Sequence, residues 1–99
     1  MNEVFLKIFK DDKNTLVAVC DTGLIGETFR EGKLKLEVKP GFYQGVTTTI
    51  EEALRVISAA DIVNLVGKRI VDAALNAGLV SPSAVISIAG VKHVQIVRI

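Results

Sequence analysis

The sequence predicts an α+β fold, in which a mostly antiparallel sheet is covered by two helices. Segments with the alternating pattern of strands lie near both ends of the chain, at Glu3–Lys10 and Val91–Ile99. Apolar residues at helical spacing are confined to the middle, between Thr48 and Gly78. The predicted order is therefore β-β-β-α-α-β-β. Strands that open and close the chain with helices between them are typical of α+β proteins rather than of repeated βαβ units.

The first half of the chain contains the three predicted strands Glu3–Lys10, Thr15–Cys20 and Lys33–Lys39. The polar turn Asp11–Asn14 favours an antiparallel hairpin between the first two. Thr15–Cys20 is apolar on both faces, which indicates a central strand. Leu24–Gly32 is short and glycine-rich, so we expect a turn there with Phe29 packed inward. The third strand alternates, and its core-facing residues are predicted to be Leu34, Leu36 and Val38.

Two helices follow. Thr48 with Glu51, or Thr49 with Glu52, has the spacing of a capping box at the start of the first helix. Val63–Gly67 is interpreted as a tight apolar turn leading into the second helix, Lys68 to Ala77. The predicted buried face of that helix is Ile70, Val71, Ala74 and Leu75. Gly78 ends it. Two last strands are predicted at Ala84–Ala89 and Val91–Ile99, around Gly90.

Composition limits the class of protein. A chain of 99 residues, 49% of them hydrophobic, predicts one globular domain over 1–99 and argues against disorder. The formal net charge of +1 gives no global field for nucleic acid, so any basic site must be local. Cys20 is the only cysteine, and its apolar surroundings predict a buried thiol in a reducing cytoplasm. No run of about 18 apolar residues occurs, so we expect no membrane-spanning helix.

A basic strand and an aromatic loop are the first candidate binding features. Lys33, Lys35 and Lys39 share one face of their predicted strand. They are interpreted either as a solvated face that discourages edge pairing or as a stripe that contacts phosphates. Phe42 and Tyr43 follow between glycines, and we expect one ring to cap the core while the other, Tyr43, stays accessible.

The other candidate residues are polar positions near the predicted turns. Lys68 and Arg69 begin a helix whose free amides would favour an anion, although a solvated pair is the plainer interpretation. His93 alternates with Gln95 and, with Asn64, could line a pocket for acid–base chemistry. A hydrogen-bonded structural role for His93 is the alternative. One histidine and one cysteine cannot form a conventional zinc site, and no phosphate-binding or dinucleotide motif is present, so no cofactor is expected.

Several blocks resemble, in their order, a small archaeal family of uncharacterised proteins known as a domain of unknown function. The blocks are VAVCD, FREGKLKLEV, GFYQG, EEALRVISAADIVNLVG and GVKHVQIV, and they cover nearly the whole chain. The chain departs from that pattern at Lys92, where the family suggests proline. The resemblance implies an archaeal, cytoplasmic source and no established reaction, cofactor or substrate.

A second, shorter resemblance is to the retroviral-type aspartic proteases, which are homodimers. Asp21-Thr22-Gly23 after an apolar strand, and Leu65-Val66-Gly67 before a helix, are similar to their motifs. Two Asp21 carboxylates sharing a proton would then activate water. Leu24 stands where those proteases have alanine or serine, and the spacing of the blocks is short. The alternative interpretation of Asp21 is an ordinary turn residue.

Two classes of function follow from these features. The first is a binding module for RNA or for a protein of the translation apparatus, based on the lysine strand, the Phe42–Tyr43 loop and Lys68–Arg69. The second is a small enzyme that uses Asn64, His93 and Asp21. Grouping of Asn64 and His93 beside a cleft would favour the enzyme, whereas lysines and Tyr43 on one open face would favour RNA. The oligomeric state is left open by the sequence.

Overall fold

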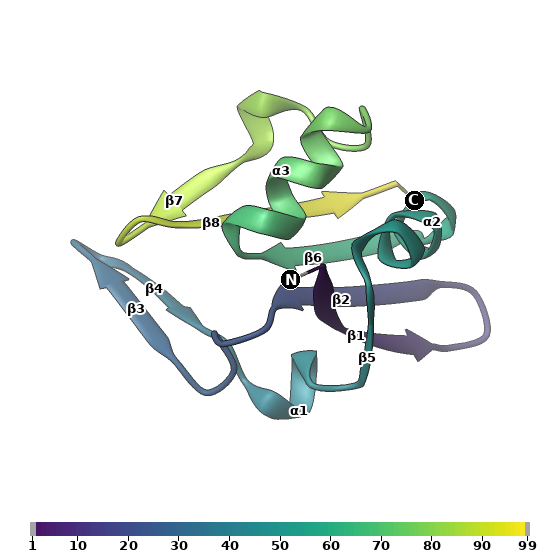
Figure 1. The fold of residues 1–99 in the computed structure, drawn as a ribbon, viewed down its shortest axis with the longest axis horizontal. Helices are drawn as coiled ribbons and strands as arrows, with labels where there is room; N and C mark the ends of the chain where they lie inside the picture. Colours follow the sequence, from purple (N-terminus) through teal and green to yellow (C-terminus); the bar gives the residue numbers. More distant parts are fainter. Residues whose placement is uncertain (1, 99) are drawn as a thin grey trace.

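A six-stranded mixed sheet forms the centre of the molecule, in the order β5-β1-β2-β6-β8-β7 (Figure 1). The computed structural model describes residues 2–98. The strands are β1 (Glu3–Lys10), β2 (Thr15–Asp21), β5 (Val46–Thr49), β6 (Ile62–Val66), β7 (Ile86–Ile88) and β8 (Val91–Val97). Every neighbouring pair is antiparallel except β2 with β6, which is parallel. The predicted α+β class is confirmed, and so is the β1–β2 hairpin.

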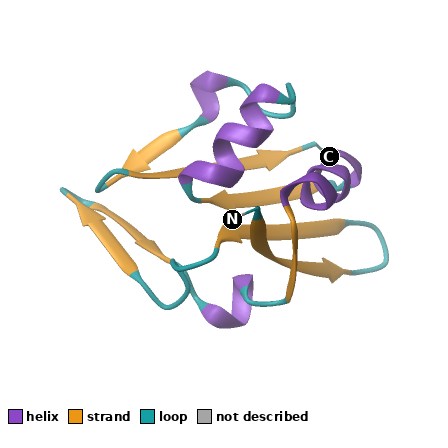
Figure 2. Cartoon of the chain, in the orientation of Figure 1, coloured by secondary structure: helices purple, strands orange, loops and turns teal. Residues whose placement is uncertain are grey.

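Helices α2 (Ile50–Ala59) and α3 (Lys68–Asn76) lie on the same side of the sheet (Figure 2). Of the two possible capping boxes, the structure uses the second, because the Thr49 hydroxyl accepts a hydrogen bond from the Glu52 amide at 3.1 Å. The side chains fully buried beneath these helices come from every central strand. They include Val4, Val17, Val19, Val63, Leu65 and Val94, and they pack against Ile57 of α2 and Ile70 of α3.

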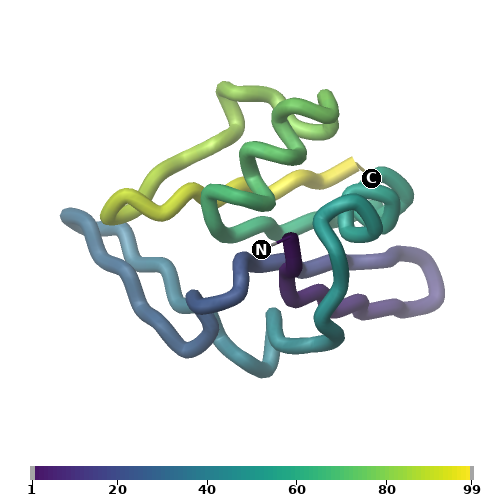
Figure 3. The backbone as a smooth tube through the Cα atoms, in the orientation of Figure 1, coloured from purple at the N-terminus to yellow at the C-terminus, as the bar shows by residue number. Residues whose placement is uncertain are grey.

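The other face of the sheet is covered only in part. A separate two-stranded hairpin, β3 (Thr28–Glu31) with β4 (Leu34–Glu37), and the short helix α1 (Pro40–Tyr43) pack there. They form a second apolar cluster with the buried residues Ala18, Cys20, Leu36, Val38, Tyr43, Val66 and Ile88. The hairpin tip meets the β7–β8 turn, where the Ala89 amide donates to Glu31 Oε1 at 2.6 Å (Figure 3).

Two segments differ from the sequence prediction. Val63–Gly67 was expected as a turn, but Ile62–Val66 is the central strand β6, hydrogen-bonded to β2 on one side and β8 on the other. Only Gly67 turns the chain, at φ +116°. Leu24–Gly32 was expected to lack a strand, yet it contains β3, which pairs with β4 outside the main sheet. β3 has only four residues and follows two glycines, so composition gives little strand signal there, although its partner β4 lies just beyond a tight turn.

Smaller differences concern single positions and element ends. Phe29 packs against the second cluster as predicted, but Leu34 is 51% exposed near the hairpin tip instead of facing the core. The sheet also gains the strand β5, and a third helix, α1, begins at Pro40. The predicted strand at 91–99 corresponds to β8, with its end at Ile99 outside the described residues. Within residues 2–98, no helix is long and apolar enough to cross a membrane.

Candidate functional site

An uncovered area of the sheet brings together three residues that the sequence singled out. Asn64 on β6 faces Gln95 on β8, and His93 faces Val66, two residues further along the same ladder. Because Val63, Leu65 and Val94 point into the core beneath the helices, these alternate residues point to the opposite face. We define the sheet floor as Leu16, Ile62, Asn64, His93, Gln95 and Val97. Gln95 and Val97 are exposed, and the other four are half-buried.

The position of His93 fixes the role of each ring nitrogen. Its Nδ1 lies 2.9 Å from the Leu65 carbonyl oxygen. A carbonyl oxygen can only accept, so Nδ1 carries the proton and Nε2 is the acceptor nitrogen of the neutral ring. His93 is therefore held by a hydrogen bond to the neighbouring strand, as its structural interpretation predicted.

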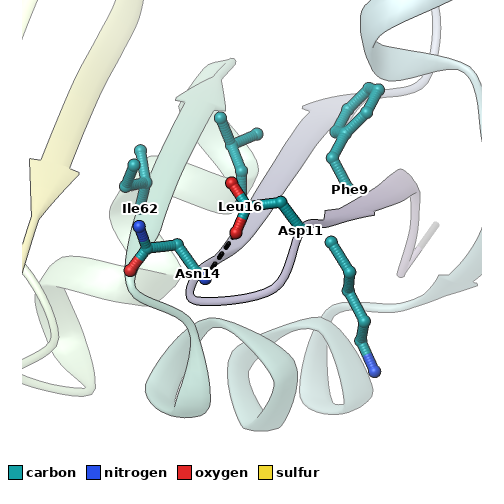
Figure 4. A pocket seen from close by; sticks show the side chains of 6 residues that line it. Phe9, Asp11, Asn14, Leu16 and Ile62 are labelled. Atoms are coloured by element: carbon teal, nitrogen blue, oxygen red, sulfur yellow. Dashed lines mark hydrogen bonds between the residues drawn. The ribbon is translucent and has the colours of Figure 1, made fainter.

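A hollow of about 220 Å³ lies beside the floor, at the end of the sheet where the β1–β2 hairpin turns (Figure 4). Its lining is Phe9, Lys10, Asp11, Asn14, Leu16 and Ile62. Asp11 Oδ1 accepts from the Asn14 amide at 2.7 Å and from the Lys13 amide at 2.8 Å. These bonds, that from Asn14 first, lower the pKa of Asp11 and fix the turn. The floor thus continues into a concave rim.

The aromatic residues are arranged differently from the prediction. Tyr43 is only 4% exposed, and burial raises its pKa to about 12, so the expected accessible ring at this position is wrong. Pro40 starts α1, whose turn directs Tyr43 into the second cluster. The half-buried ring is Phe42, which stacks on Phe9 at 5.3 Å between centroids. Lys7 Nζ lies 5.3 Å from the centre of the Phe9 ring.

The three lysines lie at the β3–β4 hairpin rather than on the main sheet, with Lys35 in strand β4, Lys33 in the turn before it and Lys39 between β4 and α1. Lys33, Lys35 and Lys39 alternate with the buried Leu36 and Val38. Arg30 is paired with Lys35 across the hairpin. Glu37 lies among them, 3.1 Å from Lys35, and that bond is the main cause of its lowered pKa. The lysines and Tyr43 therefore do not form one surface.

The amides at the start of α3 are already occupied. Asp21, the last residue of β2, accepts hydrogen bonds from the Arg69 amide at 2.8 Å and the Ile70 amide at 3.0 Å. It is buried and acts as the cap of this helix, so its interpretation as an ordinary turn residue is wrong. A Cβ at Gly67 would collide with the Asp21 side chain, which explains a glycine at the N-cap position.

Lys68 and Arg69 are engaged within the fold rather than presented as an anion site. Lys68 Nζ bonds Asp72 at 2.8 Å, and this contact raises the pKa of Lys68. Arg69 Nη2 donates to the Glu3 carbonyl at 2.9 Å and to the Thr22 hydroxyl at 3.0 Å. Sequence reasoning missed the Asp21–Gly67 contact. The one available signal was a glycine, instead of serine, threonine or aspartate, just before a helix.

The remaining chemical groups are structural. Cys20 is fully buried, and this burial raises the pKa of its thiol to about 12, in agreement with its prediction as a small apolar residue. Among residues 2–98, no group of three or more histidine, cysteine or carboxylate side chains could hold a metal ion. The sheet floor is consequently the area where predicted site residues and open surface coincide.

The fold and the floor together define an α+β protein with a helix-covered face and a half-open polar face. Residues 9–99 match the model of the protein family of unknown function DUF424, and the chain belongs to this family. No curated protein matches it. A solved structure of similar fold is the crystal structure of an uncharacterised conserved protein from Methanopyrus kandleri, at 23% identity and TM-score 0.79. The likeness covers 95% of this chain and 90% of that one.

Proposed function

We propose that this protein is a cytoplasmic binding module for single-stranded RNA, acting beside the translation apparatus, and that the sheet floor holds the bases. The observation that carries the proposal is the amide pair Asn64–Gln95 next to His93 on an uncovered sheet surface. Side-chain amides offer both donors and acceptors to base edges, and imidazole rings stack on bases. The single buried thiol suits a reducing compartment.

The phosphate contacts would come from cations near the floor and from the hairpin. Lys10 lies on the rim of the hollow, and the exposed lysines Lys33, Lys35 and Lys39 lie in or next to the hairpin. With a net charge of +1, affinity should be modest and strongly dependent on salt. Stacking is reassigned from Tyr43, which is buried, to His93 and to the half-buried rings Phe9 and Phe42.

Fluorescence anisotropy with a labelled single-stranded RNA of about ten nucleotides, over a salt series, tests this proposal. We expect Gln95→Ala to weaken binding several-fold, because an exposed amide on the floor is removed. Gln44→Ala is the matched control, since Gln44 is an exposed glutamine beyond the floor. Replacing the three hairpin lysines by glutamine should flatten the salt slope. No binding at low salt, or equal effects of the two alanine variants, would reject an RNA site on the floor.

A second candidate is a small acid–base enzyme, favoured by the fact that Asn64 and His93 lie diagonally on neighbouring strands of the same face. His93 Nε2 would accept the proton. The same RNA probe serves as the first test substrate. Cleavage by the wild type that is lost in His93→Ala and kept in Gln44→Ala would support the enzyme, whereas an intact probe in all samples would not.

A further inference from the structure

Half of strand β8 has no neighbour on its outer side. The ladder between β7 and β8 begins at the β-turn and ends with the pair Ile86–His93. Residues Val94–Val97 continue β8 for another four positions, paired with β6 alone. Val85 turns away, since its amide bonds back to the Pro82 carbonyl. Within residues 2–98, no strand occupies this edge (Figure 2).

The backbone groups that face the open edge can be identified. The Lys92 carbonyl accepts from the Gly67 amide, and the Arg98 amide donates to the Asp61 carbonyl, so even-numbered residues of β8 direct their backbone groups toward β6. Because these directions alternate along a strand, the N–H and C=O groups of Gln95 and Val97 point outward. The edge therefore presents two donors and two acceptors at regular spacing.

This segment lacks the protection that the open segment of β1, on the other side of the sheet, has. On β1, the segment beyond its pairing with β5 is Lys7–Lys10, which carries a lysine at each end. Lysines on an edge strand discourage pairing with another chain. The open part of β8 is the neutral run Val94–Val97, and the Val97 side chain is 58% exposed. Of these two open segments, that of β8 is the one suited to accept a strand.

We propose that the open edge of β8 pairs with the same edge of a second copy of this chain. Only odd-numbered residues offer outward backbone groups, and the antiparallel register that uses the groups of both residues places Gln95 of one copy opposite Val97 of the other. The two-fold axis then passes beside Ile96. This arrangement is self-complementary, so it closes as a dimer. Pairing of β8 with the segment Lys7–Lys10 of β1 would instead leave a free edge on each copy and continue into a filament.

The dimer has a consequence for the sheet floor. Gln95 and Val97 belong both to the floor and to the open edge, so edge pairing would join the floors of the two copies into one continuous surface. The proposal nevertheless stands on backbone geometry and is independent of RNA binding. The pairing segment is short, and we therefore expect a weak, concentration-dependent dimer rather than an obligate one.

Sedimentation velocity over about 5–500 µM, without RNA, measures the association. In the variant Gln95→Lys/Val97→Lys, each lysine would lie opposite a lysine of the second copy, and the dissociation constant should rise at least about tenfold. Mixing it with Gln95→Glu/Val97→Glu should restore the dimer as a heterodimer. Val46→Lys, at an exposed position on edge strand β5, is the control and should associate like the wild type.

Hydrogen exchange of the wild type supplies a test that needs no variant. The Gln95 and Val97 amides should exchange rapidly in dilute solution and become protected as the protein concentration rises. A wild type that stays monomeric over the whole range overturns the proposal. So does association that leaves these two amides unprotected, or a lysine variant that is folded and dimerises as strongly as the wild type.

Discussion

Asp21 holds together two elements that are distant in the sequence. Its carboxylate accepts both amides at the start of α3 from the end of β2, across Gly67. In Asp21→Asn, one oxygen becomes an NH₂ group that faces an amide donor. We expect the free energy of unfolding to fall by about 1–3 kcal/mol in a urea titration. Asp12→Asn, in the exposed hairpin turn, is the control, and equal stability of both variants would contradict the capping role.

Ala89 is the non-glycine residue with positive φ, at +51°, among the described residues. It lies with Gly90 in the tight β7–β8 turn. Glycine adopts this conformation without a Cβ penalty, so Ala89→Gly should raise the free energy of unfolding by about 0.5–1 kcal/mol. In helix α2, Ala59→Gly should lower it, which separates the turn effect from the general cost of glycine. A decrease for both variants would disprove strain at Ala89.

Local residue motifs were predictable, and distant ones were not. The Thr49–Glu52 cap spans three residues, so its spacing is visible in the sequence. The Asp21–Ile70 bond joins residues 49 positions apart, and nothing local indicates it. Asn64, His93 and Gln95 were candidates by residue type, but only the β6–β8 register places them on one face.

At the scale of the helix, the inner face of α3 is shifted slightly from the prediction. Ile70, Val71 and Ala74 are fully buried, whereas Leu75 is half-buried at the edge of the core. Ile70→Ala should therefore cost about 2–5 kcal/mol of unfolding free energy. Leu75→Ala should cost clearly less, because its site is partly open to solvent. Denaturant titrations of both variants check the order, and a larger loss for Leu75→Ala would place the inner face at Leu75.

Strand β6 shows why the sequence misled at this scale. Strand β6 is apolar at every position except Asn64, so it shows no regular polar alternation, and five residues are too few to separate strand from turn by composition. The glycine at position 67 led to the interpretation of all of Val63–Gly67 as a turn. In the structure this glycine marks only the corner between β6 and α3.

For the whole molecule, burial of two acidic groups predicts loss of stability at alkaline pH. Burial raises the pKa of Cys20 from 9.0 to about 12 and that of Tyr43 from 10.0 to about 12. The native state then holds protons that the unfolded chain releases, so the free energy of unfolding should decline as pH rises from about 9 toward 12. Urea titrations across this range measure the slope. Cys20→Ala should make it shallower, and an unchanged slope would contradict burial of a protonated thiol.

The general architecture was predictable because strand and helix patterns occupy separate parts of the chain. The two-sided packing was not, since β3, α1 and β5 each have only four residues and β5 pairs with the distant strand β1. The candidate site was likewise predictable only in part. The polar residues of the floor were identified, while the hairpin that leaves them uncovered was not.

The parallel pairing of β2 with β6 has a kinetic consequence. Leu16 meets Ile62 only after the intervening chain has passed beneath the sheet through the hairpin and α1, rounded its edge at β5 and formed α2 (Figure 3). Closing so long a loop costs conformational entropy before the stabilising contacts between β2 and β6 can form. The β1–β2 hairpin can form early, but the barrier to folding should lie at the closure of this crossover. Core substitutions in β6, such as Val63→Ala, should therefore slow refolding in stopped-flow measurements, and a refolding rate equal to that of the wild type would contradict a barrier at this crossover.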